Sequence, residues 1–143
     1  FQFLLANQGW PQDIASWVTG MGLSPFGFLA VLMVVLLAIS MFLTGVAILV
    51  LVVPIVYPVA LSLGIDPIHL GVLFALCIEM GAVIPPVGLN LFAVSGTTGV
   101  PVTTVMRGSF PFLCSDGCVL FLCMLFPILT LWLPNIAVQS VFN

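Results

Sequence analysis

Residues 81–90 read Gly-Ala-Val-Ile-Pro-Pro-Val-Gly-Leu-Asn, and they interrupt a long apolar segment. Two consecutive prolines remove two backbone donors, and they push the residues before them out of the helical region. We therefore predict that the helix breaks here, so that segment 65–99 is a discontinuous transmembrane helix. Its first half begins at Pro67, with Asp66 as the N-cap. Its second half begins near Val87.

The composition of the chain predicts an all-α membrane protein. Hydrophobic residues make up 63% of the 143 positions and charged residues only 3%, whereas a soluble domain carries about 25% charged residues. Inside a bilayer the backbone must satisfy its own polar groups, so apolar runs of this length are expected to be helical. Strands of a membrane barrel would alternate in polarity, and these segments do not.

Several functional classes are excluded by what the sequence lacks. The single Arg and the absence of Lys leave no basic patch for nucleic acid. No nucleophile, zinc or phosphate-loop motif is present, so we expect neither an enzyme nor an organic cofactor. The four cysteines lie in apolar runs without a C-x-x-C pair, and we interpret them as small apolar fillers.

The regions on the N-terminal side of the broken helix divide at the prolines and glycines. Residues 1–24 are predicted to hold the end of a preceding span and an interfacial arm helix, and the apolar start at Phe1 leads us to expect a further segment before it. Residues 25–64 are too long for one span and short for two spans with a loop. Their middle, Ser40–Gly45, has none of the Asn, Asp, Lys or Pro that a turn in water collects. This favours a re-entrant helical hairpin over two short spans.

The C-terminal third is predicted to hold an amphipathic connector and a last span. Residues 100–110 form the connector, which carries Arg107, and residues 111–143 form the final transmembrane helix and tail. The positive-inside rule places the connector in the cytoplasm. The base of the hairpin then lies on the outer side.

Few polar groups inside the apolar segments could carry chemistry. Glu79 precedes the break by two residues, and an intramembrane carboxylate is either functional or a paired, hydrogen-bonded structural group. Asp116 lies near enough to the start of its span to reach the interface. For His69, beside Asp66, an interfacial or capping role is favoured over a ligand role. Broken helices in transporters expose carbonyls to cations and helix N-termini to anions.

The order of these features resembles the large membrane (M) subunit of the tripartite ATP-independent periplasmic (TRAP) transporters. The resemblance covers nearly the whole chain, and its most specific part is a G-x-D-P-x-H motif followed by P-P-V-G-x-N-L-F. The segments that carry it are Met41-Phe42-Leu43, Pro54-Ile55-Val56-Tyr57-Pro58, Leu63 to Gly71, Pro85 to Phe92, Arg107-Gly108, Pro111-Phe112-Leu113, Phe126-Pro127 and Leu131 to Pro134.

This resemblance implies one inverted-repeat half, the C-terminal repeat, of an elevator-type secondary transporter. Such a multi-pass protein of the bacterial inner membrane imports organic anions, such as C4-dicarboxylates, sialic acid or other sugar acids, with Na⁺ as the coupling ion. Its partners would be a periplasmic substrate-binding (P) protein, a small membrane (Q) subunit and the lipid bilayer. Many relatives carry a carboxylate where this chain has Thr44. The N-terminal repeat, which would supply the other half of the site, is missing from this chain, so we do not expect the chain to transport alone. An ion channel or a non-transporting scaffold subunit is the alternative.

With the transporter interpretation, two sites can be predicted at the discontinuities. Oxygen atoms around the hairpin tip and the helix break would hold Na⁺, because hard cations prefer oxygen ligands. The N-terminus of the second half-helix, with its unpaired N–H groups, would hold a substrate carboxylate. The predicted sodium ligands are Ser40, Thr44, Gly45, Gly81 and Pro85, and the predicted substrate-binding residues are Val87, Gly88 and Asn90.

Overall fold

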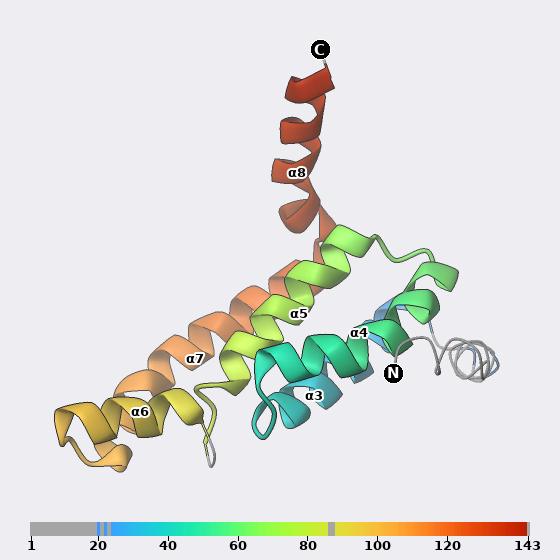
Figure 1. Cartoon of the computed structure of the whole chain (residues 1–143). Helices are drawn as coiled ribbons and strands as arrows, with labels where there is room; N and C mark the ends of the chain where they lie inside the picture. Colours follow the sequence, from blue (N-terminus) through green and yellow to red (C-terminus); the bar gives the residue numbers. More distant parts are fainter. Residues whose placement is uncertain (1–19, 21, 23, 86–87, 143) are drawn as a thin grey trace.

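The computed structural model describes residues 20, 22, 24–85 and 88–142, and within these ranges every regular element is an α-helix. The all-helical prediction is therefore confirmed for the described residues. The arm helix predicted within residues 1–24 lies almost wholly outside them. The helices, labelled as in Figure 1, are α3 (Pro25–Ser40), α4 (Gly45–Ser62), α5 (Pro67–Gly81), α6 (Leu89–Thr98), α7 (Val102–Leu125) and α8 (Pro127–Phe142).

Helices α3 and α4 form a hairpin. Ser24 caps α3, because its hydroxyl accepts a hydrogen bond from the Gly27 N–H at 3.1 Å. The turn between the helices is tight, and the N–H groups of Phe42 and Leu43 both donate to the Ile39 carbonyl at 3.0 Å. Gly64 follows α4 with φ of 74°, the left-handed conformation in which glycine commonly terminates a helix.

Helix α5 lies at the centre of the fold, in contact with α3, α4, α7 and α8. Asp66 caps it as predicted, because its carboxylate accepts from the N–H groups of Ile68 and His69 at 2.8 and 3.4 Å. Burial of apolar surface between these helices supplies the core. The side chains with almost no exposure are Leu36, Ile48, Val59, Leu73 and Cys77.

The helix interruption begins after Gly81. In a continued helix the carbonyls of Gly81 and Ala82 would accept from the N–H groups of residues 85 and 86, but both are prolines. The chain resumes as α6 at Leu89, rather than near Val87. Figure 1 shows α6 lying beside the start of α7, with the interruption close to the hairpin turn.

The C-terminal third differs from the prediction of a connector at 100–110 and a separate last helix from 111. Helix α7 runs without a break from Val102 to Leu125, with Pro111 inside it. A single proline removes only one helical hydrogen bond, so one turn of helix can tolerate it. Helix α7 ends at Leu125, because Phe126, which precedes Pro127, leaves the helical conformation with φ of −120° and ψ of 83°. Helix α8 then projects away from the other helices (Figure 1).

Within the part of the chain that the structure describes, two helices are long and apolar enough to cross a membrane. They are α4, with 18 residues, and α7, with 24 residues. The lengths correspond to about 27 and 36 Å, against a hydrocarbon core of about 30 Å. Helices α3 and α5 are apolar but shorter, with 16 and 15 residues. Many large apolar side chains of these helices are exposed, among them Val34, Val46, Phe110 and Phe112.

Candidate functional site

A hollow of about 580 Å³ lies between the start of α4, one face of α5 and the first turn of α6. Three residues of chemical interest line it: Gly45 at the hairpin tip, Glu79 near the end of α5, and Asn90 just after the break. The other lining residues are Leu49, Gly71, Ala75, Ile78 and Ala82. The hollow therefore lies between the two discontinuities that the sequence predicted, the hairpin tip and the helix break.

The hairpin tip packs tightly against the end of α5 through two glycines. A Cβ at Gly81 would overlap the Ser40 side chain, and a Cβ at Gly45 would overlap that of Ile78. Ser40 is buried, and its hydroxyl lies 2.9 Å from the Leu37 carbonyl and 3.1 Å from the Cys77 carbonyl, within hydrogen-bonding distance of both. The Ser40 hydroxyl thus binds α3 to α5 at the level of the break.

The two carbonyls affected by the prolines differ in their hydrogen bonds among the described residues. The Ala82 carbonyl accepts from the Asn90 N–H at 3.2 Å, a bond that spans the break and joins α5 to α6. For the Gly81 carbonyl, no hydrogen bond to a donor is found within residues 24–85 and 88–142. A backbone carbonyl oxygen next to the hairpin tip that accepts from no described donor is a suitable ligand for a hard cation.

The first turn of α6 offers fewer free donors than we predicted. The N–H of Gly88 donates to the Ile84 carbonyl at 3.1 Å, and that of Leu91 donates to the Gly88 carbonyl at 2.9 Å. The Asn90 N–H also donates to a backbone carbonyl, so fewer N–H groups are unpaired at the start of this half-helix than we predicted. The Asn90 side chain remains, because it is exposed and has no hydrogen bond to another described residue.

The acidic and hydroxyl groups around the hollow are accessible. Glu79 is exposed and lines the hollow. Thr44 is exposed at the N-cap position of α4 and makes no capping hydrogen bond with its side chain. Asp116, in contrast, is exposed on α7 and does not line the hollow. Glu79 is therefore the acidic side chain that the structure places at this site.

His69 has a role that the sequence did not reveal. Its side chain is only 3% exposed, and Nδ1 lies 2.7 Å from the Thr130 hydroxyl oxygen, 61 residues away. The side chain of His69 takes no part in the helix cap, because Asp66 accepts from the backbone N–H of His69, and the predicted interfacial role stays a prediction. The signal that could have found the contact is a second polar residue, Thr130, in the last apolar segment.

The structure brings most of the predicted site residues together. Ser40 and Gly81 are in contact, and Gly45 and Asn90 line one hollow with Glu79. Thr44 lies on the hairpin turn, and Pro85 lies in the interruption. Gly88 is buried, where a Cβ would lie 3.0 Å from the Leu91 side chain. Val87 lies outside the described residues.

A helical hairpin and an interrupted apolar helix meet at one hollow, and discontinuous helices of this kind form the binding sites of many membrane transport proteins. Residues 1–129 match the family described as "Tripartite ATP-independent periplasmic transporter, DctM component". The chain belongs to this family of membrane proteins, as the resemblance predicted.

Curated relatives support the same assignment. The chain is 44% identical over 135 residues to the "C4-dicarboxylate TRAP transporter large permease protein DctM" of Pseudomonas aeruginosa, covering 94% of this chain and 32% of the relative. It is 35% identical over 136 residues to the "Sialic acid TRAP transporter large permease protein SiaM" of Vibrio cholerae, covering 95% and 32%. It is 27% identical to the "Ectoine/5-hydroxyectoine TRAP transporter large permease protein UehC" of Ruegeria pomeroyi, covering 96% and 32%. The chain thus spans about a third of these relatives.

Proposed function

We propose that this chain contributes one half of the transport site of a sodium-coupled permease that imports an organic anion across the bacterial inner membrane. A periplasmic binding protein would deliver the substrate, and a small membrane subunit would complete the complex. The observation that carries the proposal is the hollow where the hairpin tip, Glu79 and Asn90 meet. We favour a C4-dicarboxylate as substrate, since three relatives with identities from 36% to 44% carry that name.

The chemistry around the tip favours a cation. The Gly81 carbonyl oxygen accepts from no donor among the described residues, and the Thr44 hydroxyl makes no capping hydrogen bond to α4. Glu79 adds a carboxylate to the adjoining hollow. These are oxygen ligands, which Na⁺ prefers as other hard cations do. A cation held here would also offset the repulsion between Glu79 and an anionic substrate.

The Asn90 side chain is the donor that we assign to the substrate. It lines the hollow from the α6 side of the break, while its backbone N–H already serves the Ala82 carbonyl. An amide NH₂ can donate to a carboxylate without adding charge. The anion in the hollow and the cation at the adjoining hairpin tip would then lie close together, so binding of one would strengthen binding of the other.

Sodium dependence tests this function. In the intact membrane complex, Thr44→Val removes a hydroxyl ligand and is expected to raise the Na⁺ concentration for half-maximal uptake roughly tenfold, the effect of losing about 1.4 kcal/mol. Glu79→Gln is expected to act in the same direction. Thr103→Val is the matched control, because Thr103 is exposed on α7, away from the hollow. Unchanged Na⁺ dependence in both test variants would contradict the proposed ion site.

Topology can be tested independently of transport. If α3 and α4 form a re-entrant hairpin, a cysteine at Ser24 and one at Ser62 will react with an impermeant thiol reagent from the same, outer side. Both residues are exposed at the open end of the hairpin. The native cysteines are removed first, and a cysteine at Thr103 should react from the cytoplasmic side. Labelling of Thr103 from the outer side would contradict this topology.

A channel remains the second candidate because Glu79 could contribute to a charged constriction. Vesicles containing the intact complex separate the two functions. A carrier is expected to accumulate substrate against its gradient only when a Na⁺ gradient is imposed. Substrate flux that follows the electrochemical gradient without Na⁺ would favour the channel.

A further inference from the structure

A buried hydrogen bond between His69 and Thr130 joins α5 to α8. The side chain of His69 is 3% exposed and that of Thr130 is 6% exposed, and Nδ1 lies 2.7 Å from the hydroxyl oxygen. Helix α8 contacts α5 and α7, and it follows Phe126, the non-helical residue that precedes Pro127. Among the side chains that the structure describes, this is the one hydrogen bond between α8 and another helix.

The geometry of this contact fits a neutral His69 ring. The Thr130 hydroxyl donates to the Pro127 carbonyl at 2.8 Å, so its oxygen accepts from Nδ1–H. The other ring nitrogen, Nε2, is buried and has no hydrogen-bond partner among the described residues. A second proton would therefore create a buried charge and a buried donor without an acceptor, and both are costly.

Asp66 is the charged group that adjoins this ring. It is exposed at the N-cap of α5, and together with His69 it lines a second hollow, of about 370 Å³, at the end of the bundle away from the break. Helices α3, α4 and α8 contain no Asp, Glu, Lys, Arg or His. Glu79 on α5 and Asp116 and Arg107 on α7 lie roughly 14 Å or more along their helices from His69 or from the end of α7. The other titratable side chains of the packed helices are Tyr57, Cys77, Cys114, Cys118 and Cys123.

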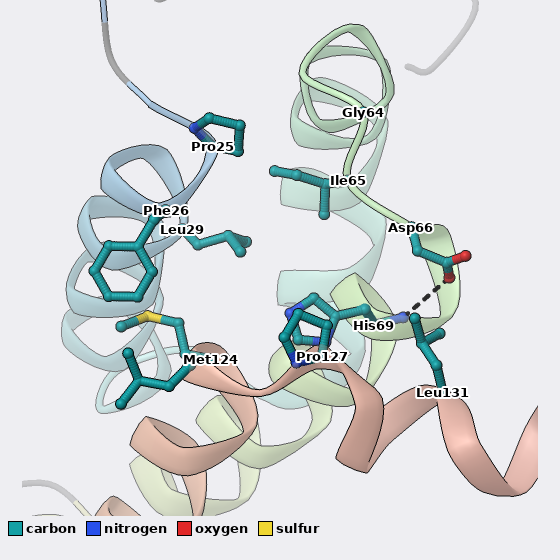
Figure 2. A pocket seen from close by; sticks show the side chains of 11 residues that line it. Pro25, Phe26, Leu29, Gly64, Ile65, Asp66, His69, Met124, Pro127 and Leu131 are labelled. Atoms are coloured by element: carbon teal, nitrogen blue, oxygen red, sulfur yellow. Dashed lines mark hydrogen bonds between the residues drawn. The ribbon is translucent and has the colours of Figure 1, made fainter.

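A protonated His69 ring has a different partner within reach. Asp66 and His69 are three residues apart at the start of α5, and side chains at this spacing are neighbours on one face of a helix. Figure 2 shows the ring turned away from the Asp66 carboxylate, which accepts from the backbone N–H of His69. The hollow that both residues line gives the ring space to turn. The side chain thus has Thr130 as a partner when neutral and Asp66 when protonated.

We propose that His69 is a pH-sensitive latch, which holds α8 against α5 when the ring is neutral and releases α8 when the ring takes up a proton and turns to Asp66. The latched arrangement disfavours the second proton, whereas the released ring gains a carboxylate partner. The latch therefore holds above the ordinary pKa of histidine, about 6.5, and weakens as the pH falls below it. It shares no lining residue with the hollow at the break and does not depend on the proposed transport function.

Distances between two spin labels in the purified intact complex test the latch. The native cysteines are replaced, and labels are attached to cysteines at Ser62, at the end of α4, and Ile136, on α8, which are both exposed. We expect one narrow distance population at about pH 8 and a second population that becomes the larger one at about pH 5, since this range spans the titration of histidine. The same distance distribution at both pH values would overturn the proposal.

Variants assign the response to its residues. His69→Asn places an amide donor near the position of Nδ1 and does not titrate, so one population is expected at both pH values. Thr130→Val keeps the shape but removes the acceptor, and should shift the equilibrium several-fold toward the second population at about pH 8. Asp66→Asn keeps the helix cap but removes the partner of the protonated ring, so the midpoint should move to lower pH, whereas the control Asp116→Asn should leave it unchanged. A pH response that survives in His69→Asn would overturn the proposal.

Discussion

Gly81→Ala is expected to destabilise the complex and abolish most uptake, although alanine is the better helix former. The added Cβ would overlap the Ser40 side chain and would also lie 2.8 Å from the Ser40 backbone carbon, which a rotamer change cannot move. Overpacking of this kind costs about 1–3 kcal/mol. It would also push the hairpin tip away from the break. Thermal unfolding of the purified complex measures the first effect, and substrate uptake in vesicles measures the second.

Gly71→Ala is the matched control for stability. It lies on the same helix, α5, and its added Cβ would meet no atom within 4 Å. Helix propensity alone then predicts a gain of about 0.4–1 kcal/mol. The double variant Gly81→Ala with Ser40→Gly removes the side-chain overlap but not the backbone approach, so only part of the stability should return. A Gly81→Ala protein as stable as Gly71→Ala would show that the contact between the tip and α5 is loose.

Asn90→Leu is expected to weaken the apparent affinity for substrate by roughly 10- to 150-fold. It keeps the size of the side chain but removes the amide donor, and a hydrogen bond to a charged group contributes about 1.5–3 kcal/mol. The bond that spans the break is made by the backbone N–H of Asn90 to the Ala82 carbonyl, so the leucine variant retains it. Concentration-dependent uptake in vesicles measures the affinity.

The sodium dependence of the same variant separates a substrate role from an ion role. Asn90→Leu is expected to leave the Na⁺ concentration for half-maximal uptake nearly unchanged when substrate is saturating, unlike Thr44→Val. Asn90→Gln retains the amide and should recover part of the affinity. An unchanged apparent affinity in the leucine variant, with normal membrane expression, would leave Asn90 as a structural residue and remove the support for the anion site.

Much of the local structure was predictable because its causes are local. Asp66 and Pro67 mark a helix start through capping and a fixed φ, and the structure shows that cap. Pro85 and Pro86 interrupt a helix wherever they occur in one. The extent of α7 was less predictable. Pro111 looks like a boundary by the same rule, yet α7 continues through it and ends before Pro127.

The sequence by itself therefore determined a helical membrane protein, the cap at Asp66 and an interruption at the double proline, because composition, capping and missing N–H groups act within a few residues. Only the tertiary structure decided which groups meet. Ser40 reaches Gly81 and His69 reaches Thr130 across 61 residues of chain because α5 packs against both α3 and α8. The contacts of Ser40 and His69 depend on the relative positions of whole helices, which neighbouring residues do not specify. At the start of α6 the path of the interruption decided the outcome, because its own carbonyls engage the N–H groups of Gly88, Asn90 and Leu91, and Asn90 and Glu79 line one hollow.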